Sequence, residues 1–223
     1  MIKTSAVIVA AGKGARMGAG MNKAYLPLCG KTVIETAILP FSESDEIDEI
    51  IVVTDDVAKC KQLVGDIPKV KAVLLGGETR KDSVKIGLSA ASGDFVAIHD
   101  GARALVTQKE IETVIFAAKK YGAAALGVKC KDTLKITDDD GFITGTQDRE
   151  RLYQIQTPQV FKTAEILEMH KKAVGDFTDD CAVMESFGGK IKLVEGSYEN
   201  IKLTTPEDIL TAEKILEKRG FSR

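Results

Sequence analysis

The segment from residue 6 to residue 23 constrains the fold of this chain more than any other. It opens with an unbroken apolar run over residues 6–11, which predicts a strand buried on both faces of a sheet. A loop follows that holds four glycines and three cations, Lys13, Arg16 and Lys23. Glycines let backbone N–H groups approach a ligand, and clustered N–H groups beside fixed cations suit a polyphosphate. We therefore expect a phosphate-binding loop at the carboxyl end of a first strand, where open α/β sheets bind ligands.

Two familiar phosphate-binding motifs do not fit this loop. A dinucleotide fingerprint, G-x-G-x-x-G, fails because Met17 occupies the third glycine position, which excludes a Rossmann oxidoreductase. A Walker A loop fails because no Gly-Lys pair stands in the required frame. The remaining pattern, A-A-G-x-G-x-R-M followed by N-K, resembles the loop of nucleotidyltransferases that act on sugar and polyol phosphates. A strand-to-helix turn with solvated charges is the plainer alternative, and the spacing of Arg16 and Lys23 argues against it.

Composition narrows the class of protein and its partners. The 223 residues, 44% of them hydrophobic and 29% charged, are typical of one substantial α/β core. A formal net charge of −2 shows no general attraction to nucleic acid or membranes, so neither is expected as a partner. The chain has no apolar run of 18 residues and leads directly into a strand, which predicts a cytoplasmic protein. Its four cysteines are dispersed without a C-x-x-C pair, so we expect neither a zinc site nor disulfides.

Strand and helix patterns alternate along most of the chain. Apolar strands are predicted at residues 6–11, 48–54, 70–75, 94–99 and 123–128, and helices at 32–41, 57–64 and 108–121. Residues 76–83 are predicted to open a further helix that runs to about residue 91. After residue 157 the pattern resumes, with helices at 163–174, 178–187 and 205–218 and a strand at 190–195. This order predicts a doubly wound, mostly parallel Rossmann-like sheet of the α/β class.

Two further segments are expected at the same edge of this sheet as the glycine loop. The pair Gly76-Gly77 lies between a strand and a helix, so its backbone N–H groups suit a ligand, although Thr79 or Asp82 capping the helix explains the segment equally well. Asp100 ends a buried strand, which is a good position for a Mg²⁺ ligand. The alternative for Asp100 is a turn-forming aspartate before Gly101.

The regular alternation is interrupted at about residues 131–149. The sequence T-L-K-I-T, the turn D-D-D-G and the return F-I-T-G-T form a β-hairpin pattern. A lone hairpin has two open edges and little core, so we expect it to pack on another subunit as an arm.

Seven segments in order carry a wider resemblance. They are the glycine loop, G-G-E-T-R-K-D-S-V-K-I-G-L, H-D-G-A-R, K-D-T, D-R-E-R-L-Y-Q-I-Q-T-P-Q-V-F, F-T-D-D and N-I-K-L-T-T-P-E-D, spanning about residues 6–208. Together they resemble the 2-C-methyl-D-erythritol 4-phosphate cytidylyltransferase family. The resemblance implies a single nucleotidyltransferase domain over residues 1–223, with the arm at about 131–149 exchanged in a homodimer. It also implies CTP as donor, a polyol phosphate as acceptor, Mg²⁺ or another divalent cation, and release of pyrophosphate.

The resemblance also implies roles for individual residues. Arg16 and Lys23 match the catalytic cations, and Asp100 matches the metal ligand. Nucleotide-binding positions are matched by Ala10, Ala11, Gly12, Gly14, Gly77, Glu78 and Ser83. Acceptor-binding positions are matched by Arg103 and Lys202, and by Thr133 and Arg149 from the partner's arm. The chain departs from the family pattern H-D-A-A-R-P at Gly101 and Ala104, which leaves Asp100 and Arg103 in place.

Two rivals share most of these features. Ribitol-5-phosphate cytidylyltransferases have the same loop, donor and chemistry with a different acceptor, and Thr133 with the arm sequence favours methylerythritol phosphate. The second alternative is a non-catalytic regulator that binds nucleotides on the same fold. The joint presence of Arg16, Lys23, Asp100 and Lys202 argues against it.

Overall fold

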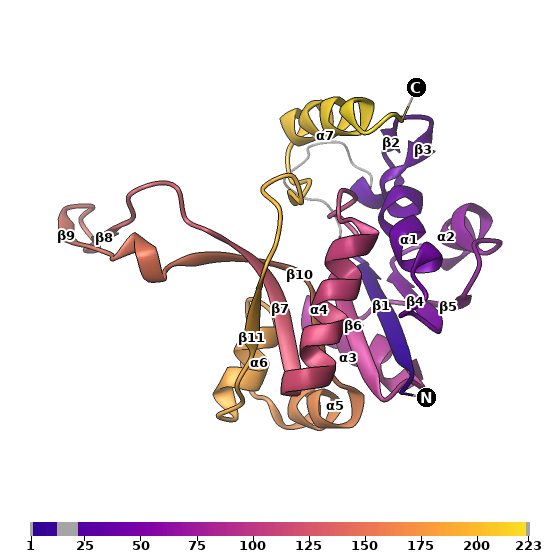
Figure 1. Cartoon of the computed structure of the whole chain (residues 1–223), viewed down its shortest axis with the longest axis horizontal. Helices are drawn as coiled ribbons and strands as arrows, with labels where there is room; N and C mark the ends of the chain where they lie inside the picture. Colours follow the sequence, from indigo (N-terminus) through magenta and orange to yellow (C-terminus); the bar gives the residue numbers. More distant parts are fainter. Residues whose placement is uncertain (1, 13–21, 222–223) are drawn as a thin grey trace.

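The core of the molecule is one twisted sheet of seven strands (Figure 1). The computed structural model describes residues 2–12 and 22–221. The strands are β1 (Thr4–Ala10), β4 (Glu49–Thr54), β5 (Val70–Leu75), β6 (Phe95–Asp100), β7 (Ala123–Lys129), β10 (Tyr153–Lys162) and β11 (Lys192–Glu195), in the order β11-β7-β10-β6-β1-β4-β5. Within this sheet, as far as the structure describes it, only β10 runs antiparallel to its neighbours, β6 and β7. The predicted mostly parallel α/β sheet is confirmed.

Helices cover both faces of this sheet, as expected for a doubly wound fold. They are α1 (Val33–Glu43), α2 (Val57–Val64), α3 (Arg80–Ala90), α4 (Gln108–Tyr121), α5 (Thr163–Lys172), α6 (Asp180–Ser186) and α7 (Pro206–Lys218). In β1, Ala6 and Ile8 join the core cluster formed with α1, α2 and α4, whereas Val7 joins the cluster with α3, α5 and α6. The unbroken apolar run of β1 is therefore explained by burial on both faces.

Most helices begin at a residue whose side chain caps them. Thr32 and Thr107 form capping boxes with the glutamates three residues later, so α1 and α4 start where their sequences predict. Thr79 caps α3, which decides between the two caps considered for that helix. Asp179 caps α6. Each cap satisfies backbone N–H groups that have no partner inside the helix.

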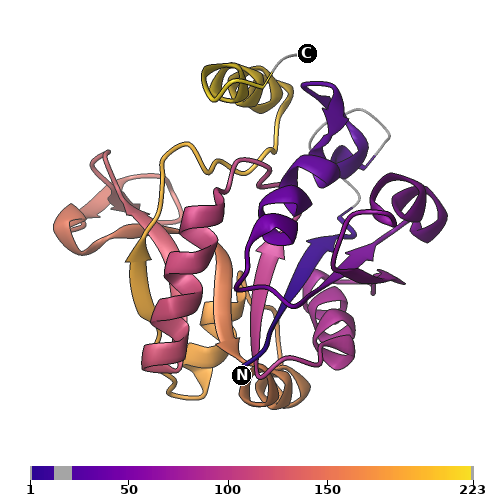
Figure 2. The same ribbon diagram turned by 45° about the vertical axis from the view of Figure 1, so that its right-hand side comes forward.

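The last helix fixes a segment beside the carboxyl edge of the sheet. Figure 2 shows α7 lying beyond the carboxyl ends of the central strands. Its residues Ala212 and Leu216 share an apolar cluster with Leu28 of the short strand β2 (Pro27–Leu28), which pairs with β3 (Lys31–Thr32). The backbone N–H of Leu203 donates to the carbonyl of Ala102 at 2.8 Å. This packing holds residues 200–204 against the end of β6.

The predicted arm leaves the body of the molecule as a hairpin (Figure 1). Its strands are β8 (Lys135–Thr137) and β9 (Ile143–Thr146), which pair antiparallel, and a short 3-10 turn, η3 (Arg149–Arg151), follows. Every residue from 131 to 151 is exposed except Gly145, which is half-buried. Within the described residues, no helix is long and apolar enough to cross a membrane.

Candidate active site

A pocket of about 930 Å³ lies at the carboxyl edge of the sheet. It is lined by Val9, Ala10, Ala11, Gly12, Asn22, Lys23, Ala24, Gly76, Gly77, Glu78, Thr79, Arg80, Ser83, Asp100, Gly101, Ala102, Lys202 and Thr204. Four segments far apart in sequence therefore meet there: the end of β1 with the start of the short helix η2 (Lys23–Tyr25), the loop before α3, the end of β6, and residues 202–204.

The pocket brings together nine of the residues predicted to act at the site. These are Ala10, Ala11, Gly12, Lys23, Gly77, Glu78, Ser83, Asp100 and Lys202. Gly14 and Arg16 lie outside the described residues. Arg103, Thr133 and Arg149 do not line the pocket within their own chain.

The loop before α3 has little freedom. A Cβ atom on Gly76 would lie 2.3 Å from Cβ of Ala11, so no larger residue fits there without moving the wall of the pocket. The buried Ser83 hydroxyl accepts a hydrogen bond from the Gly77 N–H at 3.1 Å and donates one to the Thr79 carbonyl at 3.1 Å. In this structure Ser83 therefore braces the loop.

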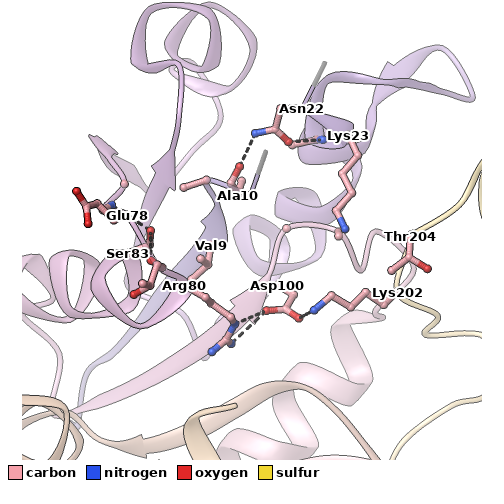
Figure 3. Close-up of a pocket in the computed structure, with 18 residues that line it drawn as sticks. Val9, Ala10, Asn22, Lys23, Glu78, Arg80, Ser83, Asp100, Lys202 and Thr204 are labelled. Carbon is pink, nitrogen blue, oxygen red and sulfur yellow. Dashed lines mark hydrogen bonds and ion pairs between the residues drawn. The ribbon is translucent and has the colours of Figure 1, made fainter. Parts of the chain in front are cut away.

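Asn22 fixes the other side of the pocket. Its amide Nδ2 donates to the Ala10 carbonyl at 2.7 Å and to the Asp55 carboxylate at 2.6 Å, and its Oδ1 accepts from the Ala24 N–H. Because these bonds hold η2 against the ends of β1 and β4, Lys23 projects into the pocket (Figure 3).

The adjacent carboxylates Asp55 and Asp56, which follow β4, have different partners. Asp56 alone caps the helix, because its carboxylate accepts from the Lys59 N–H at 3.0 Å. Asp55 turns toward Asn22 instead, and it lies 3.5 Å from the Tyr25 hydroxyl. One carboxylate suffices for the cap, so the second is available to hold the pocket wall.

Asp100 lies in the floor of the pocket between two cations (Figure 3). Its Oδ1 accepts from Nε of Arg80 at 3.2 Å, and its Oδ2 accepts from Nζ of Lys202 at 2.6 Å. Burial raises the pKa of this carboxyl group, but the charges of Arg80 and Lys202 outweigh burial and hold the pKa far below its usual range. Asp100 is therefore a carboxylate at any physiological pH.

The side chains near Asp100 suit a divalent cation that is bound partly by the protein and partly by a substrate. Among the residues that the structure describes, no group of three or more histidine, cysteine or acidic side chains forms a metal cage. A single carboxylate beside a wide pocket is instead the usual arrangement for Mg²⁺ bound together with substrate phosphates. Asp100 therefore fits the predicted metal ligand, with the remaining ligands coming from substrate and water.

Arg80 also lines the pocket, although no sequence motif indicates a role for it. Its Nη2 donates to the Asp180 carboxylate at 2.8 Å and lies 3.1 Å from Oδ1 of Asp100. Asp180 directly follows Asp179, which alone caps α6. The sequence does contain a sign of this ion pair: Asp179 and Asp180 are adjacent, and a helix cap needs only one carboxylate, so the second is available for another partner.

Three predicted residues lie outside the pocket, each for a visible reason. Arg103 donates from Nη1 to the Asn200 carbonyl at 2.7 Å and from Nη2 to the Ile155 carbonyl at 3.3 Å, so it ties residues 200–204 to β10. Thr133 and Arg149 are exposed on the arm. The Arg149 guanidinium donates to the Lys131 carbonyl at 3.4 Å.

The two departures from the family pattern lie beside Asp100. Gly101 packs closely, since a Cβ atom there would lie 3.1 Å from both Cβ of Ala10 and Cδ1 of Ile34. Ala104 is buried in the same apolar cluster as Leu105 and Leu203. The turn is also closed by a 2.9 Å hydrogen bond from the Arg103 N–H to the Asp100 carbonyl. Packing and this bond hold the turn without proline at position 104.

Comparison with known proteins assigns the whole described fold to one family. The family model for 2-C-methyl-D-erythritol 4-phosphate cytidylyltransferase matches residues 4–218. The protein of that name from Clostridium novyi (strain NT) is 45% identical, covering 97% of this chain and 98% of that protein. Its counterpart from Caldanaerobacter subterraneus subsp. tengcongensis is 47% identical, covering 97% of this chain and 100% of that protein.

Solved structures agree with the sequence relatives. The 4-diphosphocytidyl-2C-methyl-D-erythritol synthase of Anaerococcus prevotii DSM 20548 superposes with a TM-score of 0.87 at 35% identity, covering 97% of this chain and 96% of that chain. The 2-C-methyl-D-erythritol 4-phosphate cytidylyltransferase of Thermus thermophilus gives a TM-score of 0.78 at 31% identity, covering 97% of this chain and 100% of that chain. The resemblance noted in the sequence is confirmed: this chain belongs to the 2-C-methyl-D-erythritol 4-phosphate cytidylyltransferase family of nucleotidyltransferase enzymes.

Proposed function

We propose that this protein transfers the cytidylyl group of CTP to 2-C-methyl-D-erythritol 4-phosphate. The products are 4-diphosphocytidyl-2-C-methyl-D-erythritol and pyrophosphate, an early step in making isoprenoid precursors by the non-mevalonate pathway. The observation that carries the proposal is one pocket in which Lys23, the Asp100 carboxylate and Lys202 converge with the Gly76-Gly77 loop, in a chain of this family.

The reaction needs no nucleophilic side chain. An oxygen of the acceptor phosphate forms a bond to the α-phosphorus of CTP as the bond from that phosphorus to the β-phosphate oxygen breaks. A phosphate monoester is already anionic near neutral pH, so no proton has to be removed from the attacking group. Positioning and stabilisation of charge are then the main tasks of the protein.

The residues of the pocket divide these tasks between them. Lys23, and Arg16 by resemblance, stabilise the charge that develops on the α-phosphoryl group. When bound, Mg²⁺ neutralises charge on the triphosphate, and Asp100 would hold it. Lys202 binds the acceptor phosphate, and its side chain is 38% exposed and so is accessible from solvent. Nucleotide-binding positions are filled by Ala10, Ala11, Gly12, Gly77, Glu78 and Ser83, with Gly14 by resemblance.

We also propose that the arm completes the site of a second subunit. Leu134, Ile136, Phe142 and Ile143 on the arm are 41–72% exposed, and a two-stranded hairpin is only marginally stable alone. Packing against a partner would cover these apolar side chains. The same arm carries Thr133 and Arg149, whose predicted acceptor-binding roles require a pocket other than their own. Arg103, which follows β6 in the pocket's own chain, matches a position near the acceptor. The active protein is then a homodimer of single nucleotidyltransferase domains.

A cytoplasmic location is proposed on the chemistry of the thiols. All four cysteines lie within the described residues and carry thiols rather than disulfides. Thiols are the state in which reducing compartments keep cysteine.

A pyrophosphate-release assay tests the proposed reaction directly. Purified protein with CTP and Mg²⁺ is supplied with either methylerythritol 4-phosphate or ribitol 5-phosphate. We expect turnover with the first and at most a few per cent of that rate with the second. Preference for ribitol phosphate would reassign the acceptor, and binding of CTP without turnover on either would indicate a nucleotide-binding regulator.

A further inference from the structure

Asp180 is a buried carboxylate that reaches the pocket only through another side chain. Its side chain is fully buried on α6 and does not line the pocket. Its Oδ2 accepts from Nη2 of Arg80 at 2.8 Å, and its Oδ1 lies 3.0 Å from Nε2 of the buried His170. The backbone N–H of Asp180 donates to Oε1 of Gln159 on β10 at 3.1 Å. Three elements therefore fix the position of this carboxylate.

Arg80 links the buried Asp180 to Asp100 in the pocket. Its guanidinium contacts Asp180 from Nη2 and Asp100 from both Nε and Nη2. A guanidinium is planar, and its N–H groups point in fixed directions, so a group held on one side sets the orientation of the group held on the other. Because His170 and Gln159 hold Asp180 in place, the plane of the Arg80 guanidinium is fixed. The direction in which the N–H groups of Arg80 point at Asp100 is then fixed as well.

The two oxygens of Asp100 are held differently. Oδ1 meets Arg80, whose other contact is the fully buried Asp180. Oδ2 meets Lys202, a residue on an irregular segment with 38% of its side chain exposed. Arg80 is thus the anchored partner of Asp100 and Lys202 the accessible one (Figure 3). Oδ2 is the oxygen that can exchange its partner while Arg80 keeps the carboxylate in place.

We infer that Asp180 is a positioning residue for cytidylyl transfer, acting through Arg80 to fix the orientation of the Asp100 carboxylate toward the bound nucleotide. The inference rests on the proposed function. A purely structural Asp180 would affect only the stability of the fold. A positioning Asp180 also affects nucleotide binding and turnover of the folded protein, and does so only when Arg80 is present.

A double-mutant cycle separates these roles. The four proteins are wild type, Asp180→Asn, Arg80→Ala and the double variant, each measured per folded molecule at a temperature where thermal unfolding shows it native. We measure kcat and KM for CTP with methylerythritol phosphate, and the Kd of Mg²⁺·CTP by calorimetry. Misplacing a group in an active site by about 1 Å lowers turnover on the order of 10²-fold, and we expect Asp180→Asn to lower kcat/KM for CTP by that order. In the Arg80→Ala background it should cause no further loss beyond about twofold.

Two additional variants control for charge and for stability. Arg80→Lys keeps the charge but loses the planar fork, so it should fail to restore the wild-type kcat/KM. Asp179→Ala removes the cap of α6 one residue away and the hydrogen bond from Gln159 Nε2, but leaves Arg80 and the bond from the Asp180 N–H to Gln159 Oε1 in place. It should lower the melting temperature and leave kcat/KM unchanged. If Asp180→Asn does not fold, Asp180→Glu, which keeps the charge and moves the carboxylate, takes its place in the cycle.

The possible results have distinct meanings. If kcat/KM of Asp180→Asn matched that of Asp179→Ala, the inference would be overturned. It would also be overturned if the loss of kcat/KM in the double variant equalled the product of the two single losses. A wild-type protein that turns over neither acceptor would refute the proposed function. The calorimetric cycle would then still decide whether Asp180 acts through Arg80 on nucleotide binding.

Discussion

Nζ of Lys202 lies 2.6 Å from Oδ2 of Asp100, although 102 positions separate the two residues in the sequence. This ion pair joins the segment before α7 to the end of β6 across the floor of the pocket. The predicted ligand of the cation and the predicted ligand of the acceptor phosphate are therefore in contact. If Asp100 holds a divalent cation, that ion would replace Lys202 as a partner of the carboxylate, and Lys202 would be available to the acceptor phosphate.

Replacing Lys202 should weaken use of the acceptor more than use of the nucleotide. We expect Lys202→Ala to lower kcat/KM for methylerythritol phosphate on the order of 10²-fold, because hydrogen-bonded charge pairs in a closed site are strong. The Kd of CTP should change little. Steady-state kinetics with each substrate varied in turn measure both effects. Lys214→Ala on α7 is the matched control, since that lysine is 72% exposed and pairs only with Glu217 among the described ion pairs. A similar small effect for both variants would contradict a role for Lys202.

Lys23 should matter for the chemical step. The Lys23→Ala variant is expected to lose on the order of 10²-fold in kcat while binding CTP nearly as well as wild type, because a transition-state cation acts mainly on developing charge. Single-turnover kinetics and calorimetric CTP binding give the two quantities. Lys31→Ala, on the exposed edge of β3, controls for loss of a surface charge. A kcat within about threefold of wild type would identify Lys23 as a solvated loop residue.

The wall formed by Ala10, Ala11 and Gly77 should select the base. Gly76 allows no side chain at its position and Ser83 braces Gly77, so the backbone groups of this wall are held in fixed directions. A rigid set of donors and acceptors matched to cytosine leaves polar groups unpaired with uracil, which can discriminate strongly. We expect UTP to react at least about 10²-fold less efficiently than CTP in kcat/KM. Equal efficiency would indicate a nucleotidyltransferase of broader specificity.

The sequence predicted the layers of the fold well because the relevant signals are local. The apolar run of β1, the capping boxes at Thr32 and Thr107 and the hairpin turn before Phe142 each depend on neighbouring residues. Similar reasoning located the pocket, because the carboxyl ends of parallel strands meet at one edge. Gly76 and Gly77 appeared as candidates for the same reason.

The contacts between distant side chains could not be predicted in this way. Nothing in the spacing of Arg80 and Asp180 shows that they form an ion pair, and Asn22 gives no sign of its bond to Asp55. Which of two adjacent carboxylates caps a helix depends on rotamers set by tertiary packing. The positions of Gly14 and Arg16 fall outside the described residues, so their roles stay predictions.

Glu49 gives a pH-dependent test of stability away from the pocket. Its carboxylate accepts from the Ser5 hydroxyl at 2.6 Å and from the Ser92 N–H at 2.7 Å. Burial raises the pKa of Glu49, but these hydrogen bonds outweigh burial and lower it overall. A carboxyl group whose pKa is lower in the folded state stabilises the fold above its unfolded pKa, and the contribution is lost as the pH falls through the folded pKa.

We therefore expect Glu49→Gln to destabilise the protein by about 1 kcal/mol at pH 7. The difference from wild type should begin to shrink as the pH falls below about 4.5, where Glu49 of the unfolded chain gains its proton, and should vanish once the pH falls below the lower pKa of the folded state. Urea unfolding of both proteins between pH 7 and about pH 3 measures this. A constant difference over that range would show that the charge of Glu49 is irrelevant. Activity at pH 7 should be unchanged, since Glu49 lies outside the pocket.

Mixing two inactive variants tests whether the arm of one subunit completes the pocket of the other. Lys23 lies in the pocket, whereas Arg149 is exposed on the arm. If the site is shared, a heterodimer of Lys23→Ala and Arg149→Ala subunits holds one site with both defects and one with neither. Arg151→Ala, two residues beyond Arg149 and also exposed, is the matched control and should remain active alone.

The decisive measurement is cytidylyl transfer after the two inactive proteins are mixed in equal amounts and allowed to exchange subunits. Random association makes half of the dimers mixed, so about a quarter of wild-type activity should return if the sites work independently. Differently tagged subunits, isolated together on two affinity columns, confirm that exchange took place. A mixture that exchanges subunits but remains inactive would contradict the shared site and show that each pocket is built from one chain.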